Sequence, residues 1–318
     1  MTYRADDIMG LKMDRSSPSK SLYFSEHLRD AANIVEESIN TITLDDRVIC
    51  FRIPSREELR KVVRNRRHVV TVVDDHYWGI VRDKRLPFGY RARMFTRLTK
   101  DWQRLKQVTH EWVVTSPVLG RLYPGASMID PNWDIAFDPG ELVNRDGLHI
   151  GFLGTRSHLH DLETILAGVI SFLQNFPAAR FTLFMGKHCP KELLTLSNVT
   201  NYDPMNWQEY RKLLSGLEID ISLLPSQNTQ VNKCRSRNKL FEAVYASGFC
   251  LFDEGYTHKD YAEKHDLGVS FRPSNLGQTL KTYMNDDDLL TGIKNTAKES
   301  AQTLQAEIIE KQKAALLG

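Results

Sequence analysis

The sequence is poor in cysteine and has no long apolar run. Its four cysteines are Cys50, Cys189, Cys234 and Cys250, which form no C-x-x-C pair, and its ten histidines are scattered along the chain. This pattern argues against a structural zinc site or a disulfide framework and is typical of the reducing cytoplasm. No segment approaches the roughly 18 apolar residues of a membrane-spanning helix, and the first residues lack the apolar core of a signal peptide. We therefore predict a cytoplasmic protein.

Glycine, proline and net charge are also low. The 318 residues include 18 Gly and 12 Pro, which excludes collagen-like and low-complexity classes. Hydrophobic residues make up 41% of the chain, enough for ordinary globular cores, and this length suits about two domains. The formal net charge of +2 says little about partners.

The small net charge hides a strongly basic segment. Residues 47–106 hold 17 Lys and Arg against six Asp and Glu. Residues 82–106 alone hold nine basic and two acidic residues, interleaved with Phe88, Tyr90, Phe95 and Trp102. Three explanations stay open: a solvated helix with aromatic core anchors, a surface for an anionic acceptor or the inner membrane surface, and a polyanion- or RNA-binding surface. Nucleic acid is the least favoured partner because no known binding module accompanies the segment.

Short apolar runs alternate with amphipathic stretches, most clearly in the second half. Strands are predicted at 48–54, 68–75, 112–117, 148–154, 179–186, 198–202, 219–225 and 249–254. Helices are predicted at 55–65, 91–106, 158–175, 190–196, 207–214, 236–246 and 288–317. This alternation indicates α/β domains with parallel sheets, which bind ligands at the carboxyl ends of their strands. Turn residues make 131–146 the candidate linker, which gives domains 1–140 and 141–318.

Three charged residues carry the strongest chemical signal. Arg235, Lys239 and Glu242 are spaced i, i+4 and i+7, which places them on one face of a helix. Two cations near free backbone N–H groups form a diphosphate site, and a carboxylate one turn later can accept both hydroxyls of a ribose. The alternative is a solvated face with a Lys239–Glu242 ion pair.

The stretch from Cys234 to Gly248 resembles the donor-site signature of retaining, group 1 (family four-like) GT-B glycosyltransferases. The matching positions are Arg235, Ser236, Lys239, Glu242 and Ala243, followed by a small-residue turn that ends at Gly248. Other segments resemble the same family in order: the paired aspartates Asp74-Asp75 with His76, Ser116 through Leu119 with Pro131-Asn132, the Gly154-Thr155 turn with His158 and Asp161, and the segment from Asn206 to Pro225. The resemblance covers roughly residues 48–285.

The resemblance implies a GT-B architecture, in which two Rossmann-like domains face a cleft. The N-terminal domain would bind the acceptor, the C-terminal domain would bind a nucleotide sugar, and the last helix would return toward the N-terminal domain. The implied activity is transfer of a sugar from a nucleotide diphosphate sugar to a glycan or lipid-linked acceptor, with retention, as in polysaccharide biosynthesis. No cofactor or metal is expected.

The resemblance also assigns roles to residues. Arg235 and Lys239 would neutralise the diphosphate, and Glu242 would bind the ribose. Gly154, Thr155, His158, Asp161 and Ser236 would complete the donor site, although His158 and Asp161 are equally explained as a helix cap. Asp75 and His76, next to Asp74, would lie on the acceptor side and are the remaining catalytic candidates.

Two departures from the family pattern leave alternatives open. Many members carry a second acid eight residues before the ribose-binding Glu, where this chain has Cys234. The chain also has no glycine-rich loop before residue 48, and residues 20–24 make a poor first strand. We therefore expect a reduced first domain or a chain that lacks its authentic N-terminus. The alternative functions are a non-catalytic nucleotide-sugar-binding or scaffold protein, and a polyanion- or RNA-binding protein that uses residues 82–106.

Overall fold

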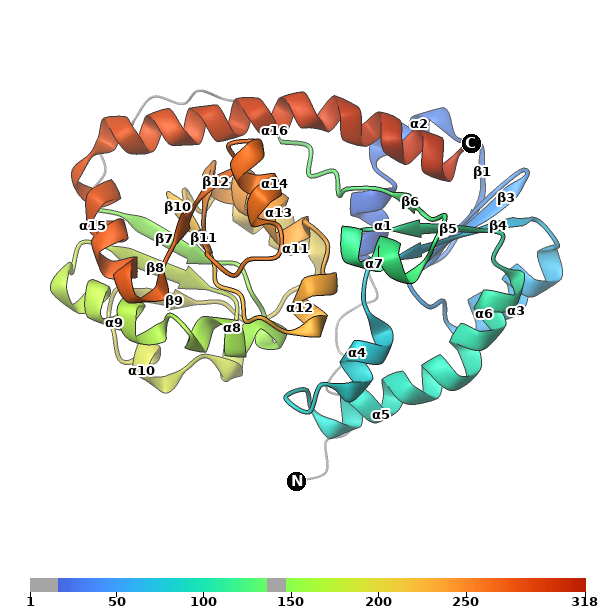
Figure 1. Cartoon of the computed structure of the whole chain (residues 1–318), viewed down its shortest axis with the longest axis horizontal. Helices are drawn as coiled ribbons and strands as arrows, with labels where there is room; N and C mark the ends of the chain where they lie inside the picture. The colour runs from blue at the N-terminus through green and yellow to red at the C-terminus, as the bar shows by residue number, and fades with distance from the viewer. Residues whose placement is uncertain (1–16, 136–146) are drawn as a thin grey trace. The chain divides into compact units, whose positions relative to one another are not determined.

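The computed structural model describes residues 17–135 and 147–318, which form two compact units (Figure 1). The described part of unit 1 comprises residues 17–129, 205–216 and 311–318, and unit 2 comprises 130–135, 147–204 and 217–310. Each unit contains a six-stranded sheet with helices, which confirms the predicted α/β class. The predicted linker at 131–146 lies largely outside the described residues, as do the first sixteen residues.

The sheet of unit 1 follows chain order from β1 to β6. Its strands are β1 (Ile34–Glu37), β2 (Thr41–Leu44), β3 (Arg47–Phe51), β4 (His68–Val73), β5 (Glu111–Val114) and β6 (Ser127–Met128). Strands β1, β2 and β3 pair antiparallel, whereas β3 to β6 are parallel. The predicted strands in 48–54, 68–75 and 112–117 are confirmed, and the mostly apolar strand β4 is buried along nearly its whole length, as a strand covered on both faces would be.

The helices of unit 1 follow from local sequence signals. They are α1 (Pro18–Tyr23), α2 (Glu26–Ala31), α3 (Arg56–Asn65), α4 (Tyr77–Arg82), α5 (Phe88–Arg97), α6 (Gln103–Val108), α7 (Pro117–Leu122) and α11 (Trp207–Ser215). Ser55 and Glu58 form a capping box that starts α3. Residues 20–24, which make a poor first strand, are mostly helical: Pro18 occupies the first turn of α1, and the Ser17 hydroxyl accepts from the Lys20 N–H, so the segment begins as a capped helix.

The predicted basic helix at 91–106 is confirmed and extends beyond both predicted ends. Helices α5 and α6 are joined through a π-helical turn at Leu98–Trp102, so the helix runs from Phe88 to Val108. The turn buries Trp102 and Asp101, and Asp101 lies 3.6 Å from Arg56 of α3. The wider π-helical turn rotates the following residues about the helix axis, which keeps large apolar side chains on the inner face of the helix.

The sheet of unit 2 is parallel throughout, in the order β12-β11-β10-β7-β8-β9. Its strands are β7 (His149–Phe152), β8 (Arg180–Leu183), β9 (Val199–Asn201), β10 (Ile221–Leu224), β11 (Cys250–Asp253) and β12 (Gly268–Phe271). The chain builds outward from β7 through β8 to β9, then returns to place β10 on the other side of β7. The neighbouring strands β7 and β10 therefore mark the point where strand order reverses.

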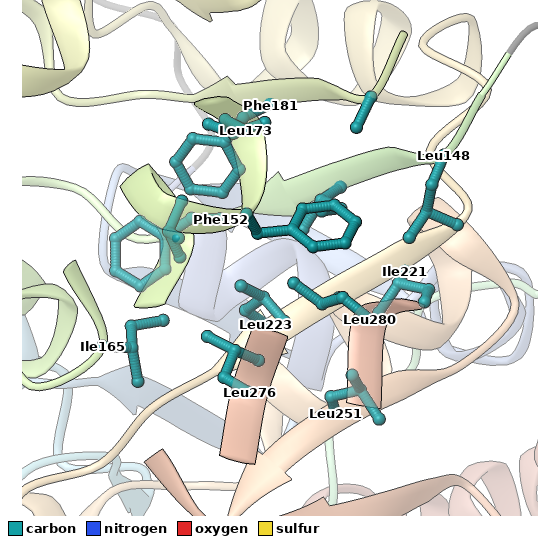
Figure 2. Close-up of a cluster of buried hydrophobic side chains, with 14 of the residues drawn as sticks. Leu148, Phe152, Ile165, Leu173, Phe181, Ile221, Leu223, Leu251, Leu276 and Leu280 are labelled. Carbon is teal, nitrogen blue, oxygen red and sulfur yellow. The ribbon is translucent and has the colours of Figure 1, made fainter. Parts of the chain in front are cut away.

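The helices of unit 2 enclose a large apolar core. They are α8 (Leu159–Glu163), α9 (Leu166–Asn175), α10 (Lys191–Leu194), α12 (Gln230–Cys234), α13 (Asn238–Ser247), α14 (Lys259–Lys264) and α15 (Leu276–Asn285). Figure 2 shows side chains of this core, including Phe152 and Phe181 from strands and Leu173, Leu276 and Leu280 from helices. The single helix predicted at 158–175 is broken, because the Thr164 hydroxyl donates to the Asp161 carbonyl and the Ile165 N–H bonds to Leu162 in a tighter turn.

The predicted final helix is confirmed as α16 (Asp287–Leu316). Most of α16 belongs to unit 2, and residues from Lys311 onward belong to unit 1. Within unit 1, the buried amide of Gln312 donates to the Leu22 carbonyl at 3.0 Å. Across the described ranges, the structure contains no helix long and apolar enough to cross a membrane.

Candidate functional site

The reversal of strand order between β7 and β10 locates the candidate site. Parallel sheets bind ligands at the carboxyl ends of their strands. The preferred place is the point where the strand order reverses, because the loops that follow the two neighbouring strands there lead away in opposite directions. Here β7 leads into Leu153 and the Gly154-Thr155 turn, and β10 leads into Pro225 and a polar loop. The segment that carries Arg235 and Lys239 follows this second loop.

Gly154 is required by space at the end of β7. A Cβ at this position would lie 2.5 Å from the Phe152 ring and 2.8 Å from the Cβ of His158. The turn therefore packs against its own strand, while Thr155 lies exposed at its tip. The predicted glycine turn is present, and its glycine gives close packing at the place where a ligand would approach the backbone.

Arg235 does not lie on the helix that carries Lys239 and Glu242, so the prediction of one shared helical face was wrong for this residue. Thr229 caps the short helix α12, which ends at Cys234, and Arg235 is extended with ψ 150°. The Arg235 side chain instead reaches the β7 loop, where Nη1 donates to Nδ1 of His158 at 2.6 Å and lies 3.5 Å from Asp161 Oδ2. The non-helical residues between α12 and α13 thus allow Arg235 to extend toward the carboxyl end of β7.

His158 and Asp161 connect the two loops. Burial, followed by the charge of Arg235, lowers the pKa of His158 to about 3, so its imidazole is neutral and can accept from Arg235. Asp161 Oδ1 accepts from the Gln227 backbone N–H at 3.0 Å and from the Asn232 amide at 2.8 Å. Burial acts to raise the pKa of Asp161, but His158, the Gln227 N–H and the charge of Arg235 leave the pKa lowered. Both residues were predicted to bind the donor, and the structure shows them in contact with Arg235 and with the loop after β10.

Lys239 and Glu242 come from the first turns of α13. Lys239 Nζ donates to the Leu153 carbonyl at 2.6 Å and pairs with the carboxylate of Glu242. The Glu242 side chain is only 2% exposed, whereas that of Lys239 is 27% exposed. The predicted Lys239–Glu242 pair therefore exists, and it lies at the carboxyl end of β7, where Arg235 also reaches. Ser236, another predicted donor residue, accepts from the Asn238 N–H at 3.3 Å in the turn before α13.

The paired aspartates belong to unit 1, at the carboxyl end of β4. Asp74 Oδ2 accepts from the Ser19 hydroxyl at 2.6 Å, and Arg52 reaches both Asp74 at 3.3 Å and Asp75 at 3.1 Å. The charge of Asp74, opposed by burial, raises the pKa of Arg52. His76 packs over Gly79, and burial lowers the pKa of its imidazole. Arg52 was not predicted; it follows β3 with a positive φ of 65°.

Comparisons with known proteins agree on the architecture. No protein-family model matches the chain, and no curated protein matches its sequence. Among solved structures, WaaG, a glycosyltransferase involved in lipopolysaccharide biosynthesis, superposes with a TM-score of 0.55 at 14% identity, over 84% of this chain and 86% of WaaG. HepE of Anabaena, solved with UDP and glucose, gives 0.54 at 12% identity, over 84% of this chain and 77% of HepE. TarM of S. aureus, solved with fondaparinux, α-GlcNAc-glycerol and UDP, gives 0.51 at 12% identity, over 78% of this chain and 50% of TarM.

This chain has the GT-B fold. The fold predicted from the resemblance is confirmed, whereas sequence identities of 12–14% leave activity and site roles as proposals. This chain spans half the length of the TarM chain and most of WaaG. Across the described part of the chain, no cluster of three or more His, Cys, Asp or Glu side chains could hold a metal ion.

Several residues that support the site in this GT-B chain escaped the sequence prediction. Arg237 forms a buried ion pair with Asp130 at 2.7 Å and lies over the Tyr261 ring at 3.6 Å. His258 bonds to the carbonyl of Arg235 at 2.8 Å. These residues fix the backbone between α12 and α13. Arg237 stands two residues after Arg235, which could have suggested a structural role for it beside the predicted role of Arg235. The residues that it contacts, however, lie far away in the sequence.

Proposed function

We propose that this chain transfers a sugar from a nucleotide diphosphate sugar to a glycan or lipid-linked acceptor, with retention of configuration. The observation that carries the proposal is the convergence of Arg235 and Lys239 on the carboxyl end of β7, beside the reversal of strand order. Two cations at such a site match a diphosphate in charge and position. The WaaG, HepE and TarM folds support a glycosyltransferase in general, and the UDP in two of those structures makes UDP-sugars the first donors to test.

The arrangement of Lys239 and Glu242 suggests how the donor enters. In the structure Lys239 covers the buried carboxylate of Glu242 and is anchored to the Leu153 carbonyl. A diphosphate would attract the ammonium away from this position, because it offers more negative charge than one carboxylate and one carbonyl. The uncovered Glu242 would then accept both hydroxyls of the ribose.

Transfer itself requires stabilisation of the leaving group. As the bond between the sugar and the diphosphate breaks, negative charge grows on the diphosphate, and Arg235 and Lys239 lie where they can stabilise it. The acceptor hydroxyl attacks on the same face, and its proton passes to the departing phosphate oxygen, so no protein nucleophile is needed. Asp74, Asp75 and His76 remain the candidates for the acceptor side. We propose that no metal is required, so a chelator should leave transfer unchanged.

A donor panel tests the proposal. Purified protein is mixed with UDP- and GDP-sugars, and the shift in melting temperature and the release of nucleoside diphosphate are followed. Binding of at least one nucleotide sugar, weakened by Lys239→Ala, is the expected result. Failure of every nucleotide sugar to bind would contradict the proposal.

Binding without transfer is a second candidate, and Cys234 favours it. This side chain stands where related enzymes carry an acid toward the donor sugar, and it is fully buried. Because the residue is a cysteine, no carboxylate is available at this position to orient the sugar. Tight nucleotide-sugar binding with no product across a panel of glycan and lipid-linked acceptors would favour this candidate over the transferase.

A further inference from the structure

Three neighbouring strands of unit 2, β7, β10 and β11, end at the same edge of the sheet. The two cations of the candidate site converge at the end of β7, and a polar loop follows β10 after Pro225. Strand β11 ends at Asp253, one residue beyond the parallel pair of Leu224 with Phe252. Asp253 therefore lies on the far side of the β10 loop from the end of β7.

The loop that begins at Asp253 lies against the segment that leads to Arg235. A Cβ on Gly255 would be 3.8 Å from the carbonyl oxygen of Ser226. Farther along the same loop, Nε2 of His258 donates to the carbonyl of Arg235 at 2.8 Å. These two contacts fix the backbone next to Asp253 with respect to the cation that reaches the end of β7.

The carboxylate of Asp253 has one oxygen to which no protein group donates. Oδ1 accepts from the Gly255 N–H at 2.6 Å, and among residues 17–135 and 147–318 no donor or cation reaches Oδ2. Burial raises the pKa of Asp253 against the opposing effect of this N–H, and the charges of Glu254 and Asp161 add to the rise. Glu254 differs from it, because Glu254 pairs with Arg272 at 2.8 Å. A half-buried carboxylate with a free acceptor oxygen is suited to bind hydroxyl groups.

We propose that Asp253 binds hydroxyl groups of the donor sugar and that this sugar carries no negative charge. The inference rests on the proposed function, in which Glu242 takes the ribose at the end of β7. The nucleoside and the sugar leave the diphosphate in opposite directions, which leaves the ends of β10 and β11 for the sugar. Strands β7 and β11 are two strand spacings apart, roughly 10 Å, and a hexose attached to the diphosphate can span this distance.

The position of Asp253 also accounts for the cysteine in the preceding segment. Cys234 offers no carboxylate to the sugar, and Asp253 supplies one from the neighbouring strand. A uronic acid would bring a second carboxylate against Asp253, and like charges in contact are unfavourable. The site therefore selects neutral sugars such as hexoses and N-acetylhexosamines.

Calorimetric titration separates binding of the sugar from binding of the nucleotide. The parent protein and its variants are titrated with UDP-glucose beside UDP, and with GDP-mannose beside GDP. Asp253→Asn keeps an acceptor for the Gly255 N–H but removes the charge. We expect this variant to bind the sugar nucleotide about tenfold more weakly, with unchanged affinity for the matching nucleoside diphosphate. The matched control is Glu254→Gln, which removes the adjacent acid and should bind all four ligands like the parent protein.

UDP-glucuronate gives a second measurement. It should bind the parent protein about tenfold more weakly than UDP-glucose, and Asp253→Asn should narrow this difference. The inference is overturned if Asp253→Asn binds sugar nucleotides like the parent protein, if it loses affinity for UDP and UDP-glucose equally, or if the parent protein prefers UDP-glucuronate. Each of these results leaves the transferase proposal intact, whereas a parent protein that bound none of the sugar nucleotides would contradict both.

Discussion

Nη1 of Arg235 donates to Nδ1 of His158 at 2.6 Å, across 77 residues of sequence. The contact is possible because burial lowers the pKa of His158 to about 3, which leaves the imidazole neutral. His158 is in turn 3.2 Å from Asp161, which holds the loop after β10 through Gln227. We therefore propose that His158 is a positioning residue, which orients the guanidinium of Arg235.

Replacing His158 separates positioning from direct binding. His158→Ala should weaken UDP binding by about tenfold, because Arg235 loses the acceptor that orients it. His158→Asn should restore most of the affinity, since its amide oxygen can accept at a similar place. The matched control is His160→Ala, an exposed neighbour that pairs with Glu163. Equal affinity in His158→Ala and the parent protein, by calorimetry with UDP, would exclude this role.

The lowered pKa of His158 also predicts a pH dependence of stability. The folded-state pKa of about 3 lies below the ordinary 6.5, so the unfolded chain takes up the proton first as the pH falls. The stabilisation is complete above pH 6.5 and decreases toward pH 3, by about 2 kcal/mol between pH 7 and pH 5. His258, whose pKa burial lowers to about 4, adds a loss of the same sign. Urea midpoints at a series of pH values should fall less steeply for His158→Asn than for the parent protein, and parallel curves would contradict the assignment.

The two cations should matter more than the thiol of Cys234, the last residue of α12. Arg235→Ala and Lys239→Ala should each weaken UDP binding by about 2 kcal/mol, the scale of a charge-assisted hydrogen bond to phosphate. Cys234→Ala should change affinity little, because its buried side chain offers no charge. A thermal shift series with UDP measures all three. If Cys234→Ala lost as much affinity as Lys239→Ala, the segment would act through packing rather than charge.

Asp130 and Arg237 form a buried ion pair that fixes the start of α13. Their side chains are 8% and 9% exposed, and the atoms are 2.7 Å apart. Asp130→Ala should lower the free energy of unfolding by about 3 kcal/mol, because it leaves the guanidinium buried without its carboxylate. The double variant Asp130→Ala/Arg237→Met should lose less than the single one. Urea unfolding measures both, and a larger loss in the double variant would show that contacts such as the Tyr261 ring dominate.

The sequence predicts elements whose signals are local. The apolar runs of β4, β7 and β10, the capping box of α3 and the Lys239–Glu242 pair all follow from spacing within ten residues. The separation of α12 from α13 does not follow from local spacing, because no glycine or proline marks the end of α12 after Cys234. Arg235 was consequently placed on the wrong element.

Partners distant in sequence account for most of what was missed. Arg52 meets Asp75 only because β3 and β4 pair in parallel, and Arg237 meets Asp130 across 107 residues. Strand β1 was missed for another reason: its sequence IVEE is largely exposed and lacks the alternation of a half-buried strand. Polar networks and exposed edge strands thus depend on tertiary pairing, which periodicity does not record.

Gly248 ends α13 in a conformation that a side chain would strain, as the small-residue turn in the sequence suggested. Its φ is +84°, in the left-handed region, and a Cβ would lie 3.2 Å from the side chain of Lys294. Gly248→Ala should therefore lower the free energy of unfolding by about 1–2 kcal/mol. The control is Gly292→Ala in the interior of α16, where a Cβ would meet nothing within 4 Å and φ is helical. That change should raise the free energy of unfolding by about 0.5–1 kcal/mol. The two alanine substitutions should therefore shift the urea midpoint in opposite directions. Shifts of the same sign would show that the stability of α13 does not depend on its left-handed C-terminal residue.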